Sequence, residues 1–164
     1  MTSAPQVPAD VLNNVRQRWP NRAEPWAKQV ENELRALCDR YEVVASTVLP
    51  ARYGLVVAVD TPVGALVLRA SPDPHGPEQT AVAIALAELG ISPKVHQAVS
   101  TDHGTWTVLD RVRPGTPLYF ADLAVISLES LFAPLAAMRG RPAPRPGMSS
   151  ITDWLRGRLE DDQL

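Results

Sequence analysis

Three short apolar runs lie close together between residues 43 and 70, and they constrain the fold more than any other feature. They are Val43–Leu49, Leu55–Val59 and Ala65–Ala70, and the residues between them are the Pro, Gly and Asp typical of turns. Parallel neighbours need crossovers of about a dozen residues or more, so connections this short join antiparallel strands. The sequence therefore predicts an antiparallel meander.

A helix and two further strands follow the meander. After a loop rich in Pro, Asp and Gly, Pro77 starts a helix that continues to Leu89, and Gly90 ends it. Lys94–Ser100 and Thr105–Val112 have the composition of strands and are joined by a short turn. This order predicts an α+β fold, in which a five-stranded antiparallel sheet contains one inserted helix.

Two helices are predicted ahead of the sheet. The first covers Val11–Trp19 and should stop at Pro20, whereas the second begins near Glu24 with Pro25 at its first helical position. Cys38 lies beside the apolar stripe of this second helix and is expected to pack rather than react. The stripe, spaced as in an amphipathic helix, consists of Trp26, Val30, Leu34, Leu37 and Tyr41.

The last part of the chain is predicted to be a helical extension. The apolar segment Asp122–Met138 should be mainly helical, with Pro134 as a break or a second start, and a basic, proline-rich linker follows at 139–147. Ser149 or Ser150 is expected to cap a final amphipathic helix whose apolar face a partner would cover. The predicted parts are thus 1–42, helices that pack on the sheet; 43–118, the sheet with its inserted helix; and 119–164, the extension.

Composition excludes several classes of function. The 164 residues carry 16 Lys+Arg against 18 Asp+Glu, a formal net charge of −2, so binding to nucleic acid through a basic surface is not expected. One cysteine and three histidines without metal-ligand spacing argue against a disulfide framework or a zinc site. No apolar stretch reaches the roughly 18 residues of a membrane span, and no secretory signal begins the chain. A cytoplasmic protein without membrane contact is expected.

The order of elements and three stretches resemble the N-terminal lobe of aminoglycoside-phosphotransferase-like small-molecule kinases. The stretches are Leu66–Arg69, the helix from Pro77 to Gly90, and Thr107–Leu118. The last stretch is similar to the family's hinge between lobes, because an apolar strand leads through the pair Asp110-Arg111 into the turn Pro114-Gly115. The resemblance covers about residues 40 to 164, and it implies a protein-kinase-like fold and binding of ATP with Mg²⁺.

The resemblance also implies a set of nucleotide-binding residues. Arg69 stands where kinases usually have the lysine that orients the nucleotide phosphates, and Glu78 on the inserted helix would brace it. A different alignment of the helix points to Gln79 or Val82 instead of Glu78. The carbonyl of Asp110 and the amide of Val112 would hold the base. The alternatives from the residues alone are a solvated arginine at a strand end, an acid that complements a helix N-terminus, and an ordinary strand leaving a sheet.

The family's catalytic loop has no counterpart here. That loop carries His-Gly-Asp, whereas His103-Gly104 in this chain is followed by Thr105 and is predicted to lie in a turn between strands. No catalytic residue and no metal ligand is therefore assigned.

Two functions remain as expectations. The first is an N-lobe-like portion of an ATP-dependent small-molecule kinase, which would be inactive alone and need a separate catalytic-lobe chain. The second is a non-catalytic protein-interaction module, similar to a pseudokinase scaffold, that self-associates or binds a partner chain through its C-terminal helices.

Overall fold

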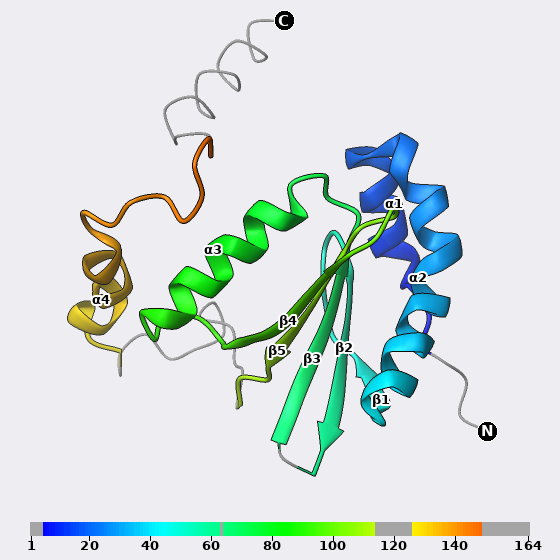
Figure 1. Ribbon diagram of the computed structural model, residues 1–164, viewed down its shortest axis with the longest axis horizontal. Helices are drawn as coiled ribbons and strands as arrows, with labels where there is room; N and C mark the ends of the chain where they lie inside the picture. The colour runs from blue at the N-terminus through cyan, green and yellow to red at the C-terminus, as the bar shows by residue number, and fades with distance from the viewer. Residues whose placement is uncertain (1–4, 63, 114–125, 149–164) are drawn as a thin grey trace, which may run out of the picture.

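The computed structural model of the protein describes residues 5–62, 64–113 and 126–148 (Figure 1). Its centre is an antiparallel sheet of five strands in the order β1-β2-β3-β5-β4, which confirms the predicted α+β fold. The strands are β1 (Val44–Val48), β2 (Leu55–Thr61), β3 (Gly64–Ser71), β4 (Val95–Ser100) and β5 (Thr105–Asp110).

The inserted helix explains why β5, and not β4, lies beside β3. Helix α3 (Gly76–Glu88) returns the chain to the end of the sheet where β3 began, so β4 runs in the same direction as β3. Because β3 and β4 are parallel to each other, β5 lies between them and pairs antiparallel with both, with Arg69 opposite Thr107. The turn from β4 to β5 passes so close to β3 that a Cβ on Gly104 would collide with the backbone carbonyl of Ser71.

The N-terminal helices differ from the prediction at two prolines. Helix α1 covers Ala9–Arg18, and α2 (Pro20–Tyr41) begins one residue after the break at Trp19. Pro20 therefore starts the second helix instead of only ending the first, a position where its missing N–H costs nothing. Pro25 lies inside α2 rather than at its start. Because Pro25 is exposed while Ala23 and Trp26 are buried, packing of the opposite face holds the helix together.

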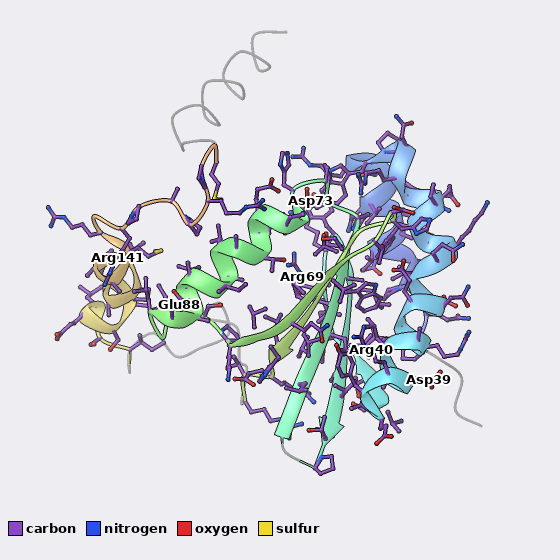
Figure 2. The ribbon with its side chains drawn as sticks, in the orientation of Figure 1. Asp39, Arg40, Arg69, Asp73, Glu88 and Arg141 are labelled. Carbon is purple, nitrogen blue, oxygen red and sulfur yellow. The ribbon has the colours of Figure 1, made fainter. Side chains whose placement is uncertain are left out.

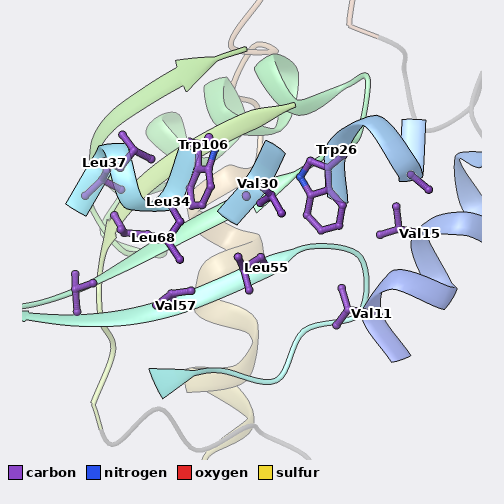
Figure 3. Close-up of a cluster of buried hydrophobic side chains, with 14 residues drawn as sticks. Val11, Val15, Trp26, Val30, Leu34, Leu37, Leu55, Val57, Leu68 and Trp106 are labelled. Atoms are coloured by element: carbon purple, nitrogen blue, oxygen red, sulfur yellow. The ribbon is translucent and has the colours of Figure 1, made fainter. Parts of the chain in front are cut away.

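One face of the sheet carries the hydrophobic core. Helices α1 and α2 cover this face, and the predicted stripe of α2 packs on alternate residues of β2, β3 and β5 (Figures 1 and 3). Trp26 is 1% exposed and Trp106 is 2% exposed, as expected of core anchors, whereas Trp19 only packs against the edge of the cluster. Fully buried members include Val15, Val30, Leu34, Leu55, Val57 and Leu68.

The opposite face is covered more sparsely. Helix α3 packs there against β4 and β5. The polar residues buried on this side are Ser71, Thr105 and Thr107 of the sheet and Thr80 of α3 itself. This side of the sheet therefore has no large apolar core.

Helix α4 (Leu128–Met138) lies at the far end of α3 in Figure 1, and none of its residues is buried. Ser127 caps it by accepting a hydrogen bond from the Ser130 N–H, 3.1 Å away. Pro134 lies within the helix, so the predicted break there is wrong. The predicted start of this segment at Asp122 and the final amphipathic helix fall outside the described residues.

Candidate functional site

Arg69, the predicted phosphate-binding residue, lies on β3 and points toward α3 (Figure 2). Its Nη2 donates a hydrogen bond to Oε1 of Gln79 over 3.1 Å. The side chain is partly buried, between α3 and the strand neighbours Val56 and Thr107. The guanidinium is thus on the face of the sheet opposite the core, at the N-terminal end of α3.

Gln79 connects this guanidinium to a carboxylate. Its Nε2 donates to Oδ2 of Asp73 over 2.5 Å, while its Oε1 accepts from Arg69. Asp73 is held in turn, because its Oδ1 accepts from the N–H of His75 over 2.9 Å. The two contacts fix the orientation of the amide, with its oxygen toward the cation and its nitrogen toward the anion. Arg69, Gln79 and Asp73 therefore form one hydrogen-bonded chain from β3 to the start of α3.

Glu78 is not the residue that holds Arg69. Its carboxylate Oε2 lies 4.0 Å from Nδ1 of the exposed His75. The same Oε2 is buried and has no hydrogen-bond partner in the described part of the chain. Of the candidates that the sequence left open, Gln79 is the one bonded to Arg69. Glu78 lies at the first turn of α3, where an acid also complements the helix N-terminus.

The predicted hinge residues lie where β5 leaves the sheet. The N–H of Asp110 donates to the Lys94 carbonyl over 3.0 Å, and its carboxylate Oδ1 lies 2.6 Å from Nε2 of His96. The N–H of Arg111 donates to the Ala65 carbonyl, which extends the pairing by one residue. Val112 is 60% exposed. The backbone pairing of β5 with β3 thus continues to Arg111, one residue before the exposed Val112.

A hollow of about 350 Å³, here called the hinge hollow, lies beside these residues. Asp110 and Val112 line it together with the apolar side chains of Leu49, Val67 and Leu109. Val67 precedes Arg69 by two positions on the same strand, so both side chains are on the same face of the sheet. The predicted hinge residues thus line a hollow on the same face of the sheet as Arg69, whereas Glu78 lies in the first turn of α3 and does not line that hollow.

Metal ligands are not gathered in the described ranges. These residues contain no group of three or more His, Cys, Asp or Glu that could hold a metal ion. His103 and Gly104 lie in the turn between β4 and β5, where both N–H groups donate to Oγ1 of Thr101. The His103-Gly104 pair therefore matches the catalytic motif in sequence only and lies in a turn between strands.

The second candidate surface is the apolar face of α4. Leu128 is 70% exposed, and Phe132 and Leu135 are each 58% exposed. Positions four and three residues apart lie on one face of a helix, so these side chains form a continuous stripe, here called the α4 stripe. A helix of this composition would ordinarily be buried in a core.

Comparisons of the chain with protein-family models, with curated proteins and with solved structures found no match. No helix in the described ranges has both the length and the apolar character that crossing a bilayer requires.

Proposed function

We propose that this chain is a non-catalytic protein-interaction module that self-associates through α4. The observation that carries the proposal is the exposure of the α4 stripe, in which Leu128, Phe132 and Leu135 are all more than half exposed. Exposed apolar patches of this kind mark interaction surfaces on soluble domains, because water is in unfavourable contact with them.

A second copy of the same helix suits the stripe. Two identical apolar stripes are self-complementary about a two-fold axis, which is the commonest symmetry of homodimers. In an antiparallel pair centred between Phe132 and Leu135, Glu129 of one copy lies near Arg139 of the other. These charges are at opposite ends of α4, so the pairing brings opposite signs together twice. Charge thus favours the antiparallel arrangement.

The expected association is weak. An 11-residue helix is about 16 Å long, and a helix pair of that length buries less than the roughly 800 Å² per partner of a stable interface. We therefore expect monomer and dimer to exchange with concentration.

Sedimentation equilibrium tests the proposal. The native chain should show a concentration-dependent dimer, and Phe132→Ser should shift the equilibrium to monomer. The matched control is Ile84→Ser, which removes an apolar side chain that is 42% exposed on α3 and should leave the dimer unchanged. A native chain that stays monomeric, or a Phe132→Ser chain that still dimerises, would contradict the proposal.

A charge swap tests the antiparallel geometry separately. Glu129→Arg and Arg139→Glu should each weaken the dimer, since each puts like charges at both ends of the helix pair. The double variant should recover most of the native association. Recovery would identify the two residues as cross-dimer neighbours, while equal or additive weakening in the double variant would exclude this arrangement.

Nucleotide binding at the hinge hollow is a second candidate. It is favoured by one observation: Arg69 and the hinge hollow lie on the same face of the sheet, as the resemblance to a kinase N-lobe implies. The base would lie against Leu49, Val67 and Leu109, with the Asp110 carbonyl and the Val112 amide at its edge. Arg69 would meet the phosphates.

The residues present fit the nucleotide better than the metal. A base and a phosphate have candidate partners, although Arg69 would have to exchange Gln79 for phosphate oxygens. Mg²⁺ prefers carboxylate oxygens, and the described residues hold no cluster of them. We therefore assign no phosphoryl-transfer step to this chain, and a catalytic lobe from a separate chain would have to supply the metal ligands.

Calorimetry with ATP, with and without Mg²⁺, tests this candidate. Heat of binding should appear in the native chain and be lost in Arg69→Ala, whereas Arg16→Ala should bind as the native chain does. Arg16 is a suitable control because it lies on α1, in an exposed pair with Glu24. If the native chain gives no heat, or if Arg69→Ala gives the same heat, nucleotide binding at this site is excluded.

A further inference from the structure

Helix α3 is apolar on the side that faces away from the sheet as well as on the side that packs on it. Its residues 81–87 are all Ala, Val, Ile or Leu, and Ile84 is 42% exposed. The inner side of the helix packs on β4 and β5. A helix with apolar residues all round is ordinarily buried on every side. Within the described part of the chain, the outer side of α3 is therefore only partly covered.

A hollow of about 500 Å³, here called the α3 groove, lies along this outer side. Its second wall is the stretch Arg141–Pro144, which follows α4 in the chain. Glu88 and Arg141 are the charged residues of the groove, and Figure 2 shows both at the end of α3 that lies near α4. None of the ion pairs in the described ranges involves either of them. The α3 wall of the groove consists of Ala81, Ile84, Ala85, Glu88 and Leu89.

A later part of the chain repeats the spacing of this wall. The α3 residues of the groove lie at intervals of 0, 3, 4, 7 and 8 from Ala81, which is the spacing of one helical face. The face of the final predicted helix has the same intervals, counted from Ile151, although its residues lie outside the described ranges. That face consists of Ile151, Trp154, Leu155, Arg158 and Leu159. One chain thus carries two apolar helical faces of equal length, and each requires a cover.

The two faces complement each other when the helices run parallel, with Ile151 level with Ala81. Leu155 then lies opposite Ala85, so that a large side chain meets a small one, as close packing of helices requires. Arg158 lies level with Glu88, so that a base meets an acid. The other charged residue of the groove, Arg141, has the acidic run at residues 160–162 of the same segment as its partner.

The connection between the groove and this segment is short. Pro144 lines the groove, and Ile151 follows it by seven positions. Seven residues span up to about 25 Å, whereas the nine residues of the α3 wall extend over about 12 Å. Either end of the groove is therefore within reach. A tether of this length holds the segment at a local concentration of millimolar order, which favours it over a partner in solution.

We propose that residues 151–159 form a helix that docks in the α3 groove of the same chain, parallel to α3. Leu155 contacts Ala85, and Arg158 pairs with Glu88. Docking covers the outer side of α3, so that the α4 stripe stays open to a second copy while the α3 face does not. The contact is made within one chain, and it therefore does not depend on protein concentration as the proposed dimer does.

Disulfide trapping in the full chain tests the docking and its register. In a Cys38→Ala background, Ala85→Cys with Leu155→Cys places two thiols across the proposed contact, where the Cα atoms should come within the roughly 4.4–6.8 Å that a disulfide spans. The matched control is Ala85→Cys with Asp153→Cys, because Asp153 belongs to the opposite face of the same helix. Under mild oxidation of dilute protein, the first pair should close within the chain at least about tenfold faster than the control pair.

Two further changes test whether the groove itself holds the segment. Adding Ile84→Asp to the Ala85→Cys and Leu155→Cys chain puts a charge into the apolar contact and should slow closure at least about fivefold. Val44→Asp is the matched control, because Val44 is 76% exposed on β1 and does not line the groove, and it should leave the rate unchanged. The ¹H–¹⁵N spectrum of each variant shows that it is folded.

The same spectra give a readout without engineered thiols. Trp154→Ala should shift the amide signals of residues 81–89, whereas Asp153→Ala should leave them in place. The proposal is overturned if the two cysteine pairs close at equal rates, if Ile84→Asp does not slow closure, or if Trp154→Ala leaves the α3 signals unchanged. Disulfides that form only between chains, at a rate that rises with concentration, would make a second copy the occupant of the groove and would also contradict the proposal.

Discussion

The two faces of the sheet differ in what they bury. Beneath α1 and α2 the sheet presents Leu, Val and Trp side chains that are almost completely excluded from water. Beneath α3 it buries Ser71, Thr105 and Thr107, and large apolar residues of the helices on that side, Ile84 of α3 and Leu128, Phe132 and Leu135 of α4, are exposed. One side of the protein therefore supplies most of its folding energy, and the other leaves apolar surface exposed to water.

The same difference has a consequence for single substitutions. Removing a side chain from the α1–α2 side leaves a cavity, since tightly packed neighbours relax only partly. Removing an exposed apolar side chain from α4 leaves no cavity and only reduces the apolar surface in contact with water. Stability and interaction should therefore respond to different residues, and the following variants test this in order of expected effect.

The largest effect is expected for Trp26→Ala. Trp26 is 1% exposed and lies between Val30 and Val15 in Figure 3, and truncation should lower the free energy of unfolding by about 3–5 kcal/mol. Urea denaturation of dilute protein measures it. Phe132→Ala on α4, studied at the same concentration, should change stability by less than about 0.5 kcal/mol. Similar losses in both variants would remove the distinction between the two sides.

A smaller effect is expected for Glu33→Ala, which removes a polar link between α2 and the sheet. The Nε1–H of Trp106 donates to Oε2 of Glu33 over 2.7 Å, and His103 lies 3.4 Å from Oε1. Because Trp106 is buried, its N–H would lose its partner, at a cost of about 1–3 kcal/mol in urea denaturation. Glu24→Ala breaks an exposed ion pair of the same length and should cost less than about 1 kcal/mol. The reverse order of losses would show that Glu33 does not hold α2 to β5.

On the α3 side, Gln79→Ala should cost about 0.5–1.5 kcal/mol. The change breaks the link between Arg69 and Asp73, although the partly buried guanidinium and carboxylate then move toward each other and recover part of the loss. Thermal unfolding measures the loss. Glu78→Ala, which breaks no hydrogen bond recorded for the described residues, is the matched control. A larger loss of stability in Glu78→Ala than in Gln79→Ala would show that Glu78, and not Gln79, is the residue that holds Arg69.

The smallest effect concerns Cys38 and pH. Burial raises the pKa of the Cys38 thiol above its ordinary value of 9.0, and Asp39 adds to the rise, while a backbone hydrogen bond from Ala45 opposes it. A raised pKa in the folded state means that the folded protein keeps the Cys38 proton up to a higher pH than the unfolded chain does. The contribution to stability is therefore complete below pH 9.0 and decreases as the pH rises through that value toward the folded pKa.

Denaturation at pH 8 and pH 10 checks this, with Cys38→Ala as the reference. The native chain should lose more stability than the reference between the two pH values. An equal loss would show that the thiol ionises alike in both states.

The fold could largely be predicted because its strongest signals are local. Short turns required an antiparallel meander, and the spacing of Trp26, Val30 and Leu34 showed which face of α2 is buried. The proline errors have a common cause. Pro20, Pro25 and Pro134 were interpreted as helix boundaries, but backbone preference is weak beside packing, and a helix tolerates proline near its start or on an exposed side.

The site was less predictable because its details depend on distant residues. The resemblance left Glu78, Gln79 and Val82 open as partners of Arg69, and the choice among them depends on how α3 packs on the sheet, where Gln79 meets Arg69. The bulge at His96 has no signature in the sequence, since it arises from the pairing of β4 with β5. Asp73 was a better signal: an Asp followed by Pro and Gly often bonds its own backbone two residues on, as it does here to His75.

Hydrogen–deuterium exchange at two protein concentrations tests most directly whether α4 is the interaction surface. The amides of Leu128–Met138 should become more protected as the concentration rises through the dimerisation range, while those of Pro20–Tyr41 should stay equally protected throughout. Protection of α4 that does not depend on concentration, or that rises equally in α2, would contradict the account.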